Sequence, residues 1–279
     1  MSNVEQSEAS RGPKKWRWIL GILALISTGF GYAFLNRGDT SPADFFNPFH
    51  WVKRMQGDDV YDEKNNILFH GNHNLKEVAL TIDDGPHKPT GDQLLDILKQ
   101  EGISATFFVV GSRMKENPDL VKRIVTEGHE IANHTQNHYR LPTLKQDQMR
   151  RELNDADINL FRITGTHFNS LMRPPGVQYN DNVLKVTKDL GYQVITWTCA
   201  ARDFEDVTPD YIVNRILSRA ENGSIILLHD DRPSTVTALP RIIASLKRDG
   251  YKFVKVSEML AHLPRPVVVN VDSRKPDGS

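Results

Sequence analysis

The segment EVALTIDDGPH, residues 77–87, is an apolar run that ends in two adjacent carboxylates, a Gly-Pro turn and a histidine. The apolar part, residues 77–82, predicts a buried β-strand, and the residues after it mark where the strand stops. Asp83 and Asp84 repel each other, and each raises the pKa of the other unless a positive charge lies nearby. The sequence therefore predicts that a positively charged group lies near Asp83 and Asp84.

Short apolar runs alternate with helical stretches from residue 76 to residue 263. Strands are expected within 77–82, 104–110, 124–134, 171–172, 192–197, 224–229 and 251–256, and helices near 90–101, 118–127, 143–164, 180–190, 208–221 and 236–249. Glycines that end helices are expected just before strands, at positions 102, 128, 191, 223 and 250. The alternation predicts an α/β fold built on a parallel sheet or barrel.

Composition excludes several classes of protein and of site. The 279 residues carry 35 basic and 35 acidic side chains, and this neutral balance does not favour a nucleic acid partner. Cys199 is the single cysteine, so an intramolecular disulfide framework and a multi-cysteine zinc cluster are excluded. A metal ion, if the chain binds one, must be held by histidine and carboxylate side chains.

The N-terminus predicts a membrane segment. Residues 18–35, WILGILALISTGFGYAFL, are eighteen positions without a charge, about the minimum for a transmembrane helix. Basic residues in 1–17 place the N-terminus in the cytoplasm, which predicts a single-pass protein of the cell membrane with its main domain on the extracytoplasmic side. A signal peptide is the alternative, because residues 31–33 loosely fit a cleavage site, and the protein would then be secreted.

Two segments lack sustained periodicity. Residues 36–75 are rich in polar, Gly and Pro residues, and we expect a linker or stalk that partly packs onto the main domain, 76–263. Residues 264–279 end polar, and we expect a loosely held C-terminal tail.

Ionisable residues follow the ends of several predicted strands. In parallel α/β folds the chemistry collects at the carboxyl ends of the strands. The residues expected on this rim are Asp83, Asp84, His134, His138, Arg173, Asp203 and His229.

The segment HTQNH, residues 134–138, carries two histidines four positions apart. On a helical turn this spacing presents both imidazoles to one divalent cation, although by itself it also fits a coincidence or a packed core feature. A carboxylate from another strand end, such as Asp84, would complete two histidines and one carboxylate, and this set leaves positions open for water and substrate. The cation would also relieve the repulsion between Asp83 and Asp84.

Five motifs in order carry a resemblance to a known family. They are TIDDGP (81–86), HTQNH (134–138), RPPG (173–176), WTCAARDF (197–204) and IILLH (225–229). Together they resemble the motifs of the polysaccharide deacetylase family, also described as the NodB-homology domain or carbohydrate esterase family 4. The resemblance runs from about residue 76 to residue 262.

The resemblance implies a deformed (β/α) barrel and a metal-dependent hydrolysis of acetyl groups from N-acetylated sugars. Asp84, His134 and His138 would bind a divalent cation, usually zinc, with cobalt or another ion possible. The cation would polarise the acetyl carbonyl and lower the pKa of its water towards about 7. Asp83 would be the general base and His229 the general acid that protonates the departing amine.

Four further residues have roles under the same resemblance. Arg173 would pair with Asp83, and Asp203 would hydrogen-bond His229 and raise its pKa. The backbone N–H of Gly176 would serve the oxyanion, at a position where many members carry an aromatic residue. Leu227 would line a pocket for the acetyl methyl group, and an ordinary core position fits it equally well.

Two positions depart from the family pattern. Ala200 stands where the fourth motif often has its first Asp, and Phe204 replaces a Trp. Both changes alter the wall of the substrate groove and leave Asp203 in place.

The sequence therefore predicts a deacetylase acting on N-acetylglucosamine units of peptidoglycan or a chitin-like surface polysaccharide. Two alternatives remain: an O-acetyl esterase acting on another polysaccharide, and a deacetylase-like domain that binds glycan without catalysis. The export signal favours a cell-wall substrate.

Overall fold

The computed structural model describes residues 60–264. The predicted membrane segment 18–35 and nearly all of the predicted tail lie outside this range. Between residues 60 and 264, no helix has the length and apolar character needed to cross a membrane.

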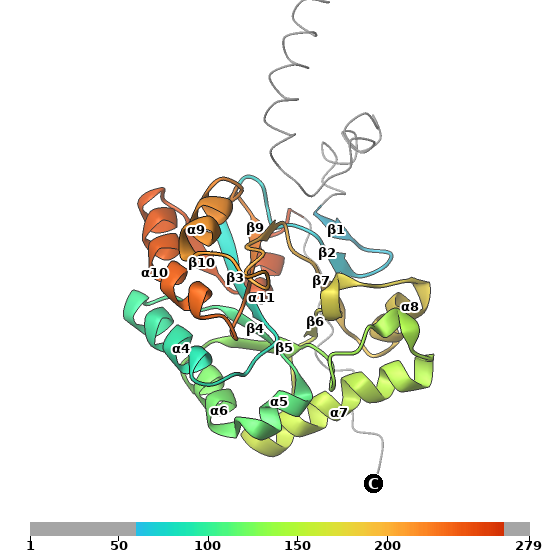
Figure 1. Ribbon diagram of the computed structural model, residues 1–279. Coiled ribbons are helices and arrows are strands. Elements are labelled where there is room, and N and C mark those ends of the chain that lie inside the picture. The colour runs from blue at the N-terminus through green and yellow to red at the C-terminus, as the bar shows by residue number, and fades with distance from the viewer. Residues whose placement is uncertain (1–59, 265–279) are drawn as a thin grey trace, which may run out of the picture. The chain divides into compact units, whose positions relative to one another are not determined.

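The described strands form one curled sheet (Figure 1). They are β1 (Tyr61–Asp62), β2 (Ile67–Leu68), β3 (Glu77–Asp83), β4 (Thr106–Val109), β5 (Glu130–Asn133), β6 (Leu171–Met172), β7 (Gln193–Ile195), β8 (Cys199–Ala200), β9 (Ser224–His229) and β10 (Lys252–Val254). Their order is β1-β2-β7-β6-β5-β4-β3-β9-β8, with β10 beside β3. The neighbours are parallel except for the antiparallel pair β1 and β2.

Most of the helices surround the outer face of the curled sheet, and α11 lies inside the curl (Figure 1). The α-helices are α4 (Thr90–Glu101), α5 (Gly111–Glu116), α6 (Pro118–Thr126), α7 (Gln146–Thr164), α8 (Asp181–Asp189), α9 (Pro209–Leu217), α10 (Pro233–Arg248) and α11 (Val256–Ala261). Two short 3-10 turns are η1 (Leu141–Thr143) and η2 (Pro175–Val177). The predicted α/β fold is confirmed as an open half-barrel, since the described strands run from β1 to β8 without closing.

The strands alternate side chains between two cores. In β3, Val78, Leu80 and Ile82 pack outward against helices such as α4 and α10, whereas Ala79 faces the inside of the curl. Helix α11 packs into the inner cluster through Met259 and Leu260. The start of α11 is bound at the amino ends of the strands, where the Val256 N–H donates to Thr106 Oγ1 over 3.0 Å. The carboxyl ends of the strands lie at the other edge of the sheet.

Three sequence-based expectations differ from the structure. The run 124–134 begins inside α6, because a proline starts this helix and its buried residues continue to Ile124; β5 starts only at Glu130. Part of the predicted linker, 36–75, belongs to the sheet, because β2 at Ile67–Leu68 pairs in parallel with β7. Helices α5 and α11 and strands β1, β2 and β8 were not predicted, because each has six residues or fewer and shows no usable period.

The register of β3 and β9 brings two predicted site residues to the same level. Asp83 lies opposite His229, the last pair in a run that starts at Val78 and Ser224. Both strands end here, so Asp83 and His229 lie on neighbouring strands at the carboxyl edge of the sheet. This edge is the candidate site.

Candidate active site

Asp83 and Arg173 form a buried ion pair. The Arg173 guanidinium is fully buried and donates from Nη1 to Asp83 Oδ1 over 2.6 Å. The same Nη1 donates to Thr81 Oγ1 over 2.9 Å, from the residue two positions earlier on the inner face of β3. The second oxygen of Asp83, Oδ2, lies 3.9 Å from His134 Nε2. One carboxylate oxygen is therefore held by arginine while the other faces the histidines.

The remaining donors of Arg173 reach the end of β7. Nε donates to the Ile195 carbonyl over 3.2 Å and Nη2 to the Thr196 carbonyl over 2.8 Å. The guanidinium carbon also lies 4.1 Å from the ring centroid of Phe108, close enough for a cation–π contact. Burial lowers the pKa of Arg173, and the charge of Asp83 acts against this shift. Four hydrogen bonds, the charge of Asp83 and the ring of Phe108 thus stabilise the buried cation.

Asp84, His134 and His138 converge on one point. Asp84 Oδ1 lies 3.3 Å from His134 Nε2 and 3.0 Å from His138 Nε2. One ligand atom from each residue falls within 4.8 Å of the others, a set that could hold a metal ion. Burial raises the pKa of Asp84, but hydrogen bonds and charges from both histidines outweigh it and bring the pKa below its usual range. The carboxylate is an ionised oxygen donor.

The histidine pair does not lie on a helical turn, so the predicted backbone was wrong. His134 follows β5, and the chain then turns through left-handed residues, with φ of 68° at Thr135 and 58° at His138. The Thr135 hydroxyl accepts the His138 N–H over 3.1 Å, and this bond stabilises the turn. The two rings nevertheless lie with their centroids 5.0 Å apart.

The tautomer of His134 fits metal binding. Its Nδ1 lies 2.7 Å from the carbonyl oxygen of Arg173, and a carbonyl can only accept, so Nδ1 carries the proton. Nε2 is then the ring nitrogen that faces Asp84, and it is the atom that could bind a cation. Metal-bound histidines are commonly oriented in this way by a carbonyl behind the ring. The donor set therefore fits a divalent cation.

His229 is paired with Asp203. His229 Nδ1 donates to Asp203 Oδ1 over 2.7 Å, and the His229 N–H donates to Asp203 Oδ2 over 2.8 Å. Asp203 is fully buried and also accepts the Thr235 hydroxyl over 2.7 Å. Burial opposes the charge on His229, but Asp203 first, and then Asp83 and Asp84, raise its pKa to about 9. His229 thus holds a proton at neutral pH.

The remaining predicted residues lie around these pairs. Leu227 is buried two positions before His229 on β9, on the same face, and Ala200 of β8 lies next to it in register. Phe204 is 51% exposed and meets the ring of His229 edge to face, with centroids 5.8 Å apart. Gly176 lies exposed in η2 with φ of 62°.

Sequence reasoning missed three residues that support the site. Thr81 has the same strand parity as Asp83, and this signal could have revealed it. Thr235, near the start of α10, is buried against Asp203, and Arg113 of α5 donates to the backbone carbonyl of Asp84. Neither position carries a sequence signal, because each depends on how a helix packs over the rim.

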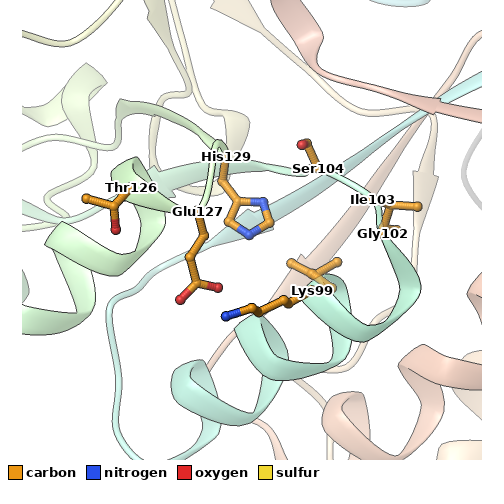
Figure 2. Close-up of a pocket in the computed structure, with 8 residues that line it drawn as sticks. Lys99, Gly102, Ile103, Ser104, Thr126, Glu127 and His129 are labelled. Carbon is orange, nitrogen blue, oxygen red and sulfur yellow. The ribbon is translucent and has the colours of Figure 1, made fainter.

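A separate pocket lies at the opposite edge of the sheet (Figure 2). It has a volume of about 350 Å³ and is lined by residues that include Lys99, Glu127 and His129. His129 precedes β5, and its Nδ1 accepts the Ala105 N–H over 3.2 Å, so this ring has a structural role at the start of the strand. None of the residues predicted for catalysis lines this pocket.

Comparison with known proteins supports the family resemblance. A family model described as polysaccharide deacetylase matches residues 70–195. A peptidoglycan-N-acetylglucosamine deacetylase of Bacillus cereus is 40% identical over 195 residues, covering 68% of this chain and 91% of the relative. The peptidoglycan-N-acetylmuramic acid deacetylase PdaA of Bacillus subtilis is 35% identical over 71% of this chain and 76% of its own length.

Solved structures show the same fold. The Bc1960 peptidoglycan N-acetylglucosamine deacetylase has a TM-score of 0.68 and 34% identity, covering 77% of this chain and 97% of that one. BA3943 from Bacillus anthracis, a CE4 family pseudoenzyme, has a TM-score of 0.69 and 31% identity, covering 72% of this chain and 71% of that one. Similarity of fold therefore extends to a structure described as a deacetylase and to one described as a pseudoenzyme.

The Arg173–Asp83 pair predicts a large loss of stability when its cation is removed. In the variant Arg173→Met the buried carboxylate of Asp83 loses its charge partner, so we expect unfolding in urea to show a loss of roughly 3–5 kcal/mol. The double variant Arg173→Met/Asp83→Asn should recover part of this loss, because no buried charge remains.

The exposed pair Arg150–Asp189, with 2.6 Å between Arg150 Nη2 and Asp189 Oδ2, provides the control. Arg150→Met should cost much less than Arg173→Met, since solvent screens this pair. Equal losses in the two single variants would show that Arg173 does not compensate a buried charge.

Proposed function

Because the chain belongs to the polysaccharide deacetylase family, we propose that it hydrolyses N-acetyl groups of N-acetylglucosamine units in cell-wall peptidoglycan. One observation carries the proposal: a held carboxylate, a triad of cation ligands and a protonated histidine share one edge of the sheet. Hydrolysis of an acetamide needs a base for water, an electrophile for the carbonyl and an acid for the amine. Relatives named as peptidoglycan deacetylases support the choice of polymer.

Asp84, His134 and His138 would hold the cation, and we propose zinc. Two imidazoles and one carboxylate suit zinc, and three protein ligands leave a position open, as in catalytic zinc sites. When bound, the ion supplies Lewis acidity to the acetyl carbonyl and lowers the pKa of a coordinated water.

Asp83 would remove the proton from the attacking water. Its Oδ1 is held by Arg173, whereas Oδ2 lies on the side of the histidines and would accept the proton. The buried guanidinium keeps the carboxylate oriented, so little reorganisation is needed during proton transfer.

His229 would donate a proton to the nitrogen as the C–N bond breaks. Water adds to the carbonyl carbon, the amine leaves with the proton from His229, and the products are acetate and a free amino sugar. Asp203 holds the Nδ1 proton of His229, so Nε2 is the nitrogen that faces the reaction. Phe204 beside this ring would form one wall of the sugar groove.

A non-catalytic role is disfavoured by the site. The pseudoenzyme BA3943 shows that this fold occurs without activity. In the present chain the candidate base, the cation ligands and the candidate acid are all present and in contact with their partners. We propose further that residues 18–35 anchor the chain in the membrane with this domain outside, where peptidoglycan lies.

The activity predicts acetate release that depends on metal. The full chain, purified in mild detergent, is incubated with peptidoglycan, with chitooligosaccharides and with an O-acetylated polysaccharide, and acetate is measured with EDTA and after zinc is restored. We expect release from peptidoglycan that EDTA abolishes and zinc recovers. Release only from the O-acetylated polymer would identify an esterase instead.

Two variants of adjacent residues serve as a matched pair in the same assay. Asp83→Asn should reduce turnover by about 10²- to 10⁴-fold while zinc still binds, because it removes the base. Asp84→Asn should lose zinc as well, as measured by metal analysis after dialysis. Full turnover by Asp83→Asn would rule out its role as base.

The raised pKa of His229 predicts how activity falls at high pH. A general acid must be protonated, so kcat/KM declines as pH rises through its pKa, which is about 9 in the absence of metal. In Asp203→Asn the main charge that raises this pKa is lost, so the basic limb of the profile should move to lower pH. The exposed Asp206→Asn, three positions away, should leave the limb in place. An unmoved limb in Asp203→Asn would mean that another group is the acid.

A further inference from the structure

Two consecutive ionisable residues at the end of β9, His229 and Asp230, have different partners. His229 binds Asp203, as described above. Asp230, the next residue, is only 1% exposed and binds His87 on the loop that follows β3. A second histidine–carboxylate pair thus lies directly beside the candidate acid, and the chemistry proposed above does not use it.

Asp230 binds both the backbone and the ring of His87. Its Oδ2 accepts the His87 N–H over 2.9 Å, and its Oδ1 accepts the proton of His87 Nδ1 over 2.5 Å. The Asp230 N–H approaches the carbonyl oxygen of Asp83 at 3.4 Å. One buried residue therefore contacts the loop on both sides of Asp84.

The loop is packed tightly against this carboxylate. A Cβ atom at Gly85 would lie 2.2 Å from Asp230 Oδ2, so only glycine allows the loop to approach this closely. On its other side the loop is held by α5 and α6, since Arg113 donates to the Asp84 carbonyl and Asn117 donates to the Pro86 carbonyl over 3.0 Å. Asp230 supplies the attachment on the side of β9.

We propose that Asp230 and His87 are a positioning pair that fixes the loop carrying Asp83 and Asp84 relative to the strand end carrying His229. The inference rests on the proposed function, because it assigns the pair a role in aligning the base and the cation ligand with the acid. Neither residue needs to touch the substrate. A misplacement of about 1 Å at a reacting group is enough to reduce turnover about 10²-fold.

The charges of the pair agree with this arrangement. Hydrogen bonding to Asp230 raises the pKa of His87, while burial and Arg113 act against the shift. Burial raises the pKa of Asp230, and His87 opposes it. The charge of the neighbouring Asp231 also favours a charged His87.

The test separates shape from charge at position 230. In Asp230→Asn the amide oxygen can still accept the backbone N–H of His87, and the amide NH₂ can donate to His87 Nδ1. The loop therefore stays attached, and kcat should stay within about threefold of wild type. Asp230→Ala removes both attachments, and kcat should fall about 10- to 100-fold with KM changed less than about threefold. Unchanged kcat in Asp230→Ala, measured where the protein is folded, would overturn the proposal.

Glu130 provides a matched control at the opposite edge of the sheet. This buried carboxylate accepts the Thr106 hydroxyl over 2.8 Å and the Ser257 N–H over 3.2 Å, so Glu130→Ala also breaks a buried attachment. We expect Glu130→Ala to lower stability and leave kcat unchanged. An equal fall of kcat in Glu130→Ala and Asp230→Ala would mean general loosening of the fold and would also overturn the proposal.

His87 allows a second route if Asp230→Ala does not fold. The ring is partly exposed, so His87→Ala leaves a site that added imidazole can fill. We expect kcat to fall in His87→Ala and to recover in part with imidazole, whereas His87→Phe, which fills the space, should not respond. Wild-type kcat in His87→Ala would contradict the role of the pair.

Hydrogen exchange distinguishes failure of this inference from failure of the proposed function. Amides of residues 83–91 should exchange faster in Asp230→Ala than in Asp230→Asn, whether or not the wild type releases acetate. If the wild type releases no acetate but exchange follows this order, the proposed function is wrong and the loop attachment stands. Equal exchange in both variants rejects the attachment itself.

Discussion

The guanidinium of Arg173 is the interaction on which the arrangement of the site depends. A fully buried cation is costly unless every donor has a partner, and its partners come from β3 and from the end of β7. The backbone of Arg173 is also hydrogen-bonded at the site: its N–H donates to the Asn133 carbonyl, and its carbonyl accepts from His134 Nδ1. One residue thus orients the candidate base and one candidate cation ligand. The hydrogen bonds of this one guanidinium thus link the end of β6, which Arg173 follows, to β3 and to the end of β7.

The charges at this edge are compensated locally. Asp83 faces a guanidinium, Asp84 faces two histidines, and His229 faces Asp203. Each carboxylate has its own positively charged or hydrogen-bonding partner, so several acidic side chains can lie close together at this edge. A cation held by Asp84 would add positive charge beside the carboxylates of Asp83 and Asp84. The fold alone does not guarantee activity, since a pseudoenzyme shares it, and function therefore depends on the side chains at the edge.

The regular parts of the fold could be predicted because a sustained apolar run or a helical period marks them. Strand β9 and helix α4 have the predicted bounds, since apolar residues define each of them over at least six positions. Short elements could not be predicted. Strand β2 has only two residues and so shows no period, and its segment was interpreted as a linker although it pairs with β7. For the site, the motifs named the charged residues, but Thr235 reaches Asp203 only through the packing of α10.

The two adjacent aspartates show why local conformation decides what a motif can do. Neighbouring residues in a strand point to opposite faces, so a regular continuation of β3 would direct Asp83 inward and Asp84 outward, away from the histidines. Asp84 instead adopts a left-handed φ of 74°, which ends the strand and turns its carboxylate back over the edge. Arg113 binds the carbonyl of Asp84 at this turn, and the glycine that follows lets the chain lie against Asp230. Such a conformation costs about 1–2 kcal/mol for a residue with a side chain, and these contacts maintain it. The repulsion between two consecutive carboxylates is thereby divided: one faces arginine inside the half-barrel, and the other faces the histidines at its edge.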